Sequence, residues 1–188
     1  MIIYYTDKYA GNREESHRLL ERAFAVHTGD AGRAKTLIDA MKKGEHGKPF
    51  IEGFSCFSIS HTGSIWAVLV ADRECGLDIQ HGRKCNMQAI AERWFAPEDA
   101  LSITAPVTDS PDTYDTFFRI WARREALTKA LGGTVYDQDL PPVSGEDVMI
   151  DGSRYMIQDI RIPGMPEIYA ALCVLKSGSM SEISFTRI

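Results

Sequence analysis

The sequence predicts an α+β fold in which strands and helices follow one another in blocks. One strand opens the chain, two helices follow, and a strand-rich stretch precedes further helices and a last group of strands. A doubly wound sheet would instead alternate strand and helix. The length of 188 residues accommodates one large domain or two small ones packed together. We expect two similar halves, residues 1–95 and 96–188, that form one compact unit.

The N-terminal region predicts one strand and two helices. Residues 2–6 have the composition of a short strand, and from 14 to about 25 apolar residues recur at helical spacing with charges between them. A second helical pattern covers residues 34–41. The segment GEHGKP at 44–49 then ends regular structure, because it contains two glycines and a proline.

The next stretch predicts three strands. Residues 54–60 look extended, 61–64 look like a turn, and 65–71 form a continuous apolar run that is typical of a buried strand. After a second turn, a short strand is expected at 77–79.

The second half predicts helices first and strands last. Residues 87–95 have helical character, and Pro97 suits the first turn of another helix. A loop is expected at 104–112, and Asp112 or Thr113 is a candidate cap for a long helix that ends at Leu131, before two glycines. The remaining strands are expected at 155–162, 168–175 and 182–186.

Composition narrows the class of protein. A net charge of −5 argues against a nucleic-acid binder, which must neutralise phosphates with Lys and Arg. The N-terminus lacks the pattern of a signal peptide, and the longest apolar runs are too short to cross a bilayer. We therefore expect a cytoplasmic protein without a membrane segment. The cysteines have no CxxC spacing and are expected to be reduced: Cys56, Cys75, Cys85 and Cys173.

The segment Gly76–Gln80 places a carboxylate on a predicted strand. Strand alternation puts Gly76, Asp78 and Gln80 on one face and the two apolar residues on the other. This face is either an ordinary solvated one or the wall of a cleft. In the second case Asp78 points at a ligand, and Gly76 lets a ligand approach the backbone closely.

The long predicted helix carries a second carboxylate. Glu125 and Lys129 are four residues apart and lie at the edge of its apolar face, where a helix can line a cleft. They could equally be a surface ion pair, which contributes only a few tenths of a kcal/mol. Arg124 projects into the apolar face, so its guanidinium needs an anionic partner unless its stem extends to solvent.

Two short segments supply further polar candidates. In Ser58–Gly63, Ser60 and His61 lie at a strand end, where a histidine can donate to a phosphate or simply occupy a turn. In Gly47–Pro49, a lysine is held by a stiff turn, although the Walker pattern GxxxxGK[ST] is absent.

Together these segments resemble one protein family. The motifs GKPF, FSISHTG, GLDIQ, ERWFAPED and WARREALTKALGG occur in this order between residues 47 and 133. Their order and spacing are similar to those of the 4′-phosphopantetheinyl transferase family, and most of all to its larger, single-chain, surfactin-synthetase-activating type. Residues 169–174 also resemble the last core strand of that family.

The resemblance implies a fold of two similar α+β halves, related by a pseudo-twofold axis, with the ligand between them. It implies transfer of 4′-phosphopantetheine from coenzyme A to a serine of an apo acyl or peptidyl carrier protein, with release of 3′,5′-ADP. Asp78 and Glu125 would coordinate Mg²⁺, Glu125 would help remove the serine proton, and Lys129 would lie by the phosphates. The nucleotide end would bind at Lys48, Pro49, Ser60, His61 and, less directly, Arg18.

This sequence departs from the family pattern at one metal ligand. Gln80 stands where many members have a second acidic residue, so it is a candidate metal neighbour with one negative charge fewer. A coenzyme A-binding relative without transferase activity is therefore an alternative, and a Mg²⁺-dependent phosphohydrolase is another, although a two-metal site would need more carboxylates. The carrier could serve fatty-acid, polyketide or nonribosomal peptide biosynthesis. A monomer is expected.

Overall fold

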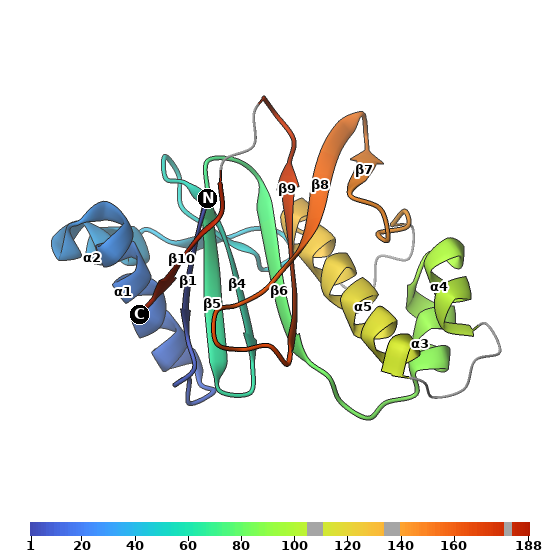
Figure 1. Ribbon diagram of the computed structural model, residues 1–188. Helices are drawn as coiled ribbons and strands as arrows, with labels where there is room; N and C mark the ends of the chain where they lie inside the picture. The colour runs from blue at the N-terminus through green and yellow to red at the C-terminus, as the bar shows by residue number, and fades with distance from the viewer. Residues whose placement is uncertain (105–110, 134–139, 179–181) are drawn as a thin grey trace.

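The protein forms two four-stranded sheets that are flanked by helices (Figure 1). This computed structural model describes residues 1–104, 111–133, 140–178 and 182–188. Helices and sheets occupy separate layers, so the predicted α+β fold class is confirmed. Among the described residues, no helix has both the length and the apolar character that a bilayer crossing requires.

The first sheet has the strand order β10–β1–β5–β4. Its centre is β5 (Ile65–Ala71), a strand buried along its whole length, which explains the continuous apolar run in the sequence. Strands β1 (Ile2–Thr6) and β4 (Cys56–Thr62) pair with β5 antiparallel, and β10 (Ser184–Arg187) pairs with β1 in parallel. The two ends of the chain therefore lie on the same sheet.

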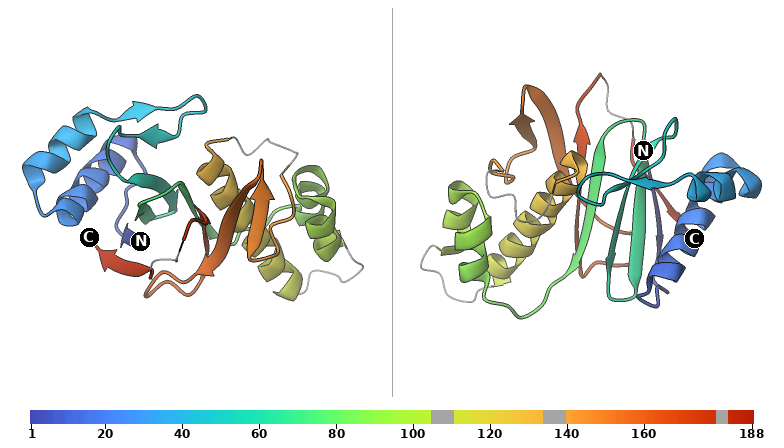
Figure 2. Two further views of the ribbon diagram at one scale, coloured as in Figure 1. Left: turned by 90° about the horizontal axis from the view of Figure 1, so that it is seen from above. Right: turned by 180° about the vertical axis from the view of Figure 1, so that it is seen from behind.

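Two helices cover the outer face of this sheet (Figure 2). The side chain of Asn12 accepts a hydrogen bond at the start of α1 (Arg13–Thr28), and Asp30 does the same for α2 (Ala31–Asp39). Gly29 ends α1 in the left-handed conformation, with φ of 70°. After α2, the short strands β2 (Lys42–Lys43) and β3 (Pro49–Phe50) form a small hairpin around the GEHGKP turn.

The second sheet has the order β6–β9–β8–β7, with antiparallel pairing throughout. Its strands are β6 (Cys75–His81), β9 (Ile168–Leu175), β8 (Ser153–Ile160) and β7 (Asp147–Ile150). One face packs against the first sheet through a shared apolar core. The other face packs against the long helix α5 (Pro111–Leu131).

Two short helices, α3 (Met87–Trp94) and α4 (Pro97–Thr104), lie beyond α5 (Figure 1). The layers thus run from α1 and α2 through the two sheets to α5 and finally to α3 and α4. Because α5 is covered on several sides, more of its surface is buried than the single apolar face that the sequence indicates.

Most predicted elements are present, with shifts at their ends. The strands at 2–6, 65–71 and 168–175 have the predicted bounds. The turn predicted at 61–64 is shorter, because β4 continues to Thr62. Helix α5 begins at Pro111, so Asp112 and Thr113 lie inside its first turn instead of capping it. Strand β7 was not predicted, and much of the loop predicted at 104–112 lies outside the described residues.

The sheets are not divided at residue 95. Strand β6 precedes that position but belongs to the sheet of β7, β8 and β9, and β10 returns from the C-terminal end to the sheet of β1. The boundary between halves 1–95 and 96–188 remains a prediction.

Candidate active site

Asp78 on β6 and Lys129 on α5 form a buried ion pair. The Nζ atom of Lys129 lies 2.6 Å from Oδ1 of Asp78, and it also donates to the carbonyl oxygen of Leu77 at 3.1 Å. The side chain of Asp78 is 3% exposed, whereas that of Lys129 is 29% exposed. The predicted polar face of β6 therefore points at α5, and the ammonium group is the more accessible partner.

Ser60 on β4 joins this pair. Its hydroxyl donates to Oδ1 of Asp78 at 2.9 Å, and it accepts from Nζ of Lys129 at 3.0 Å and from the backbone N–H of Ile79 at 3.2 Å. These three bonds use the full donor and acceptor capacity of a hydroxyl group. Ser60, predicted to bind the nucleotide end of a ligand, lies instead among protein groups in this structure.

The same arrangement repeats along the boundary between β4 and β6, which are the edge strands of the two sheets. The hydroxyl groups of Ser58, Ser60 and Thr62 accept from the backbone N–H groups of residues 77, 79 and 81, at 3.0, 3.2 and 3.1 Å respectively. We call these three residues the hydroxyl ladder. It joins the two sheets through side chains and fixes β4 beside Asp78.

Gly76 lies where α5 approaches β6 most closely. A Cβ atom at this position would be 1.8 Å from the carbonyl oxygen of Ala126 and 2.6 Å from the backbone nitrogen of Ala130. Both atoms belong to the helix backbone. The sequence predicted that a ligand approaches Gly76, and this was wrong, because the backbone of α5 occupies that space.

Glu125 adds a second carboxylate to the site. Burial raises its pKa from the usual value to about 7, and the negative charge of Asp78 adds to this effect, while Lys129 and Arg124 act in the opposite direction. Two carboxylates close enough to influence each other thus share a site with one principal ammonium group. Such a site favours an additional cation or a proton on Glu125.

The shifted pKa of Glu125 predicts how stability depends on pH when no metal is added. The folded protein holds this proton more tightly than the unfolded chain does, so the contribution of Glu125 to stability is fully present below pH 4.5 and is lost as pH rises through about 7. The loss attributable to Glu125 is at most about 3 kcal/mol. Urea unfolding with a chelator, compared between wild type and Glu125→Gln from pH 4.5 to 7.5, measures it. Parallel pH dependences in the two proteins would contradict the prediction.

Gln80 supports the carboxylate of Asp78. Its Nε2 atom donates to Oδ2 of Asp78 at 3.0 Å, so the amide directs a hydrogen and not an oxygen toward the aspartate. Within the described residues, no group of three or more His, Cys, Asp or Glu side chains is arranged to hold a metal ion. The donor set that fits Mg²⁺ here consists of Asp78 and Glu125, which suffices if water and substrate phosphates supply the other ligands.

The other predicted residues lie apart from this cluster. The ammonium group of Lys48 donates to two backbone carbonyls, those of Cys75 and Ala130, both at 3.0 Å. His61 is exposed, and its ring centroid lies 5.1 Å from that of Tyr9. Because it follows Ser60 on a strand, its side chain leaves the opposite face of β4.

A basic pocket of about 290 Å³ lies on that opposite face, between α1 and the β2–β3 hairpin. Arg18 is exposed on α1 and does not line the pocket, but Arg13 and His17 do. The sequence analysis missed these residues, although their i, i+4 spacing and the neighbouring Lys–Lys pair were visible signals. The pocket is lined by Arg13, Ser16, His17, Leu20, Ile38, Met41, Lys42, Lys43, Gly47, Pro49 and Ile59.

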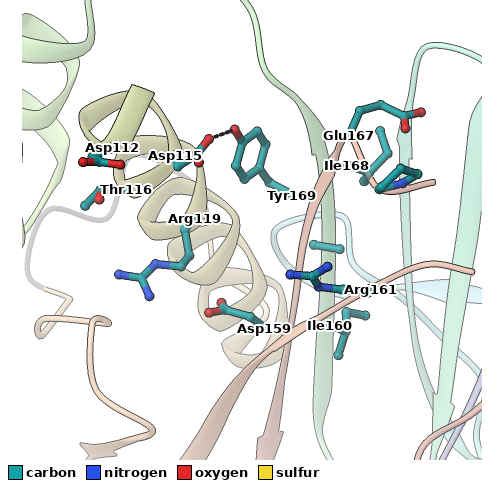
Figure 3. Close-up of a pocket in the computed structure, with 12 residues that line it drawn as sticks. Asp112, Asp115, Thr116, Arg119, Asp159, Ile160, Arg161, Glu167, Ile168 and Tyr169 are labelled. Atoms are coloured by element: carbon teal, nitrogen blue, oxygen red, sulfur yellow. Dashed lines mark hydrogen bonds between the residues drawn. The ribbon is translucent and has the colours of Figure 1, made fainter. Parts of the chain in front are cut away.

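A larger cavity lies elsewhere. It measures about 560 Å³ and is formed by the N-terminal half of α5 and the ends of β8 and β9 (Figure 3). In it the phenol of Tyr169 donates to Oδ1 of Asp115, and burial together with this carboxylate raises the pKa of Tyr169. None of the site residues predicted from the sequence lines this cavity.

Two arginines that follow one another on α5 are both buried. Arg123 donates to Asp159 at 2.6 Å and to the carbonyls of residues 143, 144 and 145, so it holds the segment that follows α5. Arg124, the arginine that the sequence placed in the apolar face, is 5% exposed. Its charge is part of the electrostatic environment of Glu125.

A match to a known protein family falls on this part of the chain. Residues 74–161, which contain Asp78, Glu125 and Lys129, match the model of the 4′-phosphopantetheinyl transferase superfamily. The 4′-phosphopantetheinyl transferase AcpT of Salmonella typhi is 34% identical over 109 residues, which cover 55% of each chain. The 4′-phosphopantetheinyl transferase gsp of Aneurinibacillus migulanus is 27% identical over 96 residues, 51% of this chain and 39% of that protein. The chain thus spans about half the length of the curated relatives it matches.

Proposed function

We propose that this chain, whose residues 74–161 match the 4′-phosphopantetheinyl transferase superfamily, transfers 4′-phosphopantetheine from coenzyme A to a serine of an apo carrier protein. The observation that supports this most directly is the cluster of Asp78, Glu125 and Lys129 between β6 and α5, inside the matched region. A partly exposed ammonium beside two carboxylates is suited to a pyrophosphate that arrives with a divalent cation.

In the proposed reaction, the serine oxygen of the carrier attacks the β-phosphorus of coenzyme A. A new bond from that oxygen to phosphorus forms, the phosphoanhydride bond to the α-phosphate breaks, and 3′,5′-ADP leaves with the electron pair. Glu125 accepts the serine proton, directly or through one water. Burial raises the pKa of Glu125 in the protein without metal, so its carboxylate is a stronger base than an exposed glutamate.

Each of the other residues has a role in binding. Asp78 and Glu125 would hold Mg²⁺, which supplies charge neutralisation at the pyrophosphate. Lys129, whose ammonium group bonds to Ser60, Leu77 and Asp78 in the protein without ligand, would exchange part of this bonding for the same phosphates. Gln80 keeps Asp78 in place by donating to Oδ2, and Ser60 does so at Oδ1.

The basic pocket beside α1 is suited to the nucleotide end of coenzyme A. Arg13, His17, Lys42 and Lys43 can offer positive charge to a phosphate there, and the turn residues Gly47 and Pro49 line the pocket on one side. We propose that His61, which is exposed on the same face of β4, also contacts the nucleotide end. We assign no role to Arg18, because it does not line the pocket.

The side chains of Asp78, Glu125 and Lys129 all come from one chain, so we propose that the protein acts as a monomer. We also propose that it acts in the cytoplasm, where coenzyme A and carrier proteins are both present. The candidate substrates are fatty-acid, polyketide and nonribosomal carriers.

The test is to mix the protein with an apo carrier, coenzyme A and Mg²⁺ and to measure the intact mass of the carrier. We expect the mass to rise by one phosphopantetheine, and we expect no rise when the carrier serine is replaced by alanine or when Asp78→Asn is used. Acyl, peptidyl and aryl carriers should each be tried. If the wild-type protein modifies none of them but binds coenzyme A, the non-transferring relative is the correct reading.

A further inference from the structure

Lys48 lies in the GKP turn, but its ammonium group is turned away from the basic pocket and into the junction between α5 and β6. It donates to the carbonyl oxygen of Ala130 at 3.0 Å and to that of Cys75 at 3.0 Å. Two of its three protons are therefore used inside the protein. Both acceptors are backbone carbonyls of α5 and β6, whereas the shortest bond of Lys129 goes to the carboxylate of Asp78.

The first of these carbonyls belongs to the last turn of α5. The last four carbonyls of a helix have no partner within it. In α5, the backbone N–H of Gly133 donates to the carbonyl of Thr128, and that of Gly132 donates to Lys129. Lys48 serves the next carbonyl, that of Ala130, and its positive charge is favourable at a helix C-terminus. Lys48, which is distant from α5 in sequence, thus provides a hydrogen-bond donor for a carbonyl in the last turn of the helix.

The second carbonyl belongs to the first residue of β6. Gly76 follows it directly, and there the backbones of β6 and α5 touch without space for a Cβ atom. One ammonium group therefore holds both elements beside their point of contact. Asp78 lies two residues after Gly76 on β6, and Lys129 lies directly before Ala130 on α5.

From this geometry we propose that Lys48 is a positioning residue, which sets α5 against β6 and so holds Lys129 and Glu125 in register with Asp78. It does this through its ammonium group and makes no contact with the phosphates of coenzyme A. The inference rests on the proposed function for its kinetic consequences but not for its structural ones. A displacement of the order of 1 Å at such a cluster can cost about 10²-fold in rate.

The test compares Lys48→Met with Lys48→Arg and with Lys35→Met, which removes an exposed charge from α2. For Lys48→Met we expect kcat to fall about tenfold or more while the Kd for coenzyme A stays within about twofold. The acidic limb of the pH–rate profile, which reports Glu125, should shift as well. Lys48→Arg keeps the charge and should restore part of the rate, and Lys35→Met should behave as wild type.

The opposite pattern would overturn the proposal. If Lys48 binds a phosphate, Lys48→Met raises the Kd for coenzyme A about tenfold or more and leaves kcat and the pH profile unchanged. A measurement on the wild-type protein covers the case in which the variant does not fold. In ¹⁵N-lysine NMR, coenzyme A should leave the Lys48 ammonium signal in place and move that of Lys129. A Lys48 signal that moves with Lys129 contradicts the positioning role.

The failure of the proposed function would look different. If the wild-type protein modified no carrier, the transfer reaction would be wrong. NMR would still decide whether Lys48 holds α5 in place. It would follow the lysine signals and compare the Asp78–Lys129 ion pair in the wild-type protein with that in Lys48→Met.

Discussion

Replacing Glu125 with glutamine should abolish transfer while coenzyme A binding partly survives. The amide keeps the shape of the side chain but accepts no proton and offers no negative charge to a cation. Loss of a general base alone costs about 10²–10⁴-fold in rate. Single-turnover measurement with an apo carrier gives the loss in rate, and calorimetric titration with coenzyme A and Mg²⁺ gives the affinity.

The matched control for this change is Glu98→Gln. Glu98 lies exposed in the first turn of α4, outside the cluster, so the same chemical change there should leave the rate within about twofold of wild type. Full activity of Glu125→Gln would remove Glu125 from the site. Loss of activity that a higher coenzyme A concentration restores would make Glu125 a binding group and not the base.

Replacing Gly76 with alanine should unfold or severely destabilise the protein. The new methyl group would lie 1.8 Å from the carbonyl oxygen of Ala126, and the obstructing atom is helix backbone, which cannot rotate away as a side chain can. Overpacking of a core usually costs about 1–3 kcal/mol, and a clash with two rigid elements should reach or exceed the upper end. Urea unfolding of the purified variant measures the change in free energy.

Gly145→Ala provides the comparison for Gly76→Ala. At Gly145, a Cβ atom would meet nothing closer than 3.8 Å, and the backbone is not left-handed. The added methyl group should therefore change the free energy of unfolding by less than about 1 kcal/mol. If Gly76→Ala were as stable as Gly145→Ala, α5 could not lie against β6 as described, and the placement of Lys129 beside Asp78 would be in question.

Strong local patterns explain why much of the fold could be predicted from the sequence. Strands β1, β5 and β9 have their predicted bounds because each is a short apolar segment between polar ones. Strand β7 has only four residues, one of them half exposed at Met149, so no pattern distinguishes it from a loop. Helix α5 begins earlier than predicted, at Pro111, because proline is favourable at the first position of a helix.

The candidate site was predictable in its residues but not in their partners. Alternation on β6 and helical spacing on α5 made Asp78, Glu125 and Lys129 candidates, and the family resemblance placed them in one site. The ion pair between Asp78 and Lys129 agrees with this. The carbonyls held by Lys48 and the bonds made by Ser60 involve residues 18 to 82 positions away in sequence. Such contacts depend on how the sheets and α5 pack, which no local pattern encodes.

The hydroxyl ladder has a consequence for solubility. Strands β4 and β6 are both sheet edges, and an exposed edge with free N–H groups is a template on which another chain can add a strand. Here β4 covers the edge of β6, because Ser58, Ser60 and Thr62 accept hydrogen bonds from its N–H groups. These N–H groups are therefore not available to pair with a strand of another chain, although the two sheets remain separate.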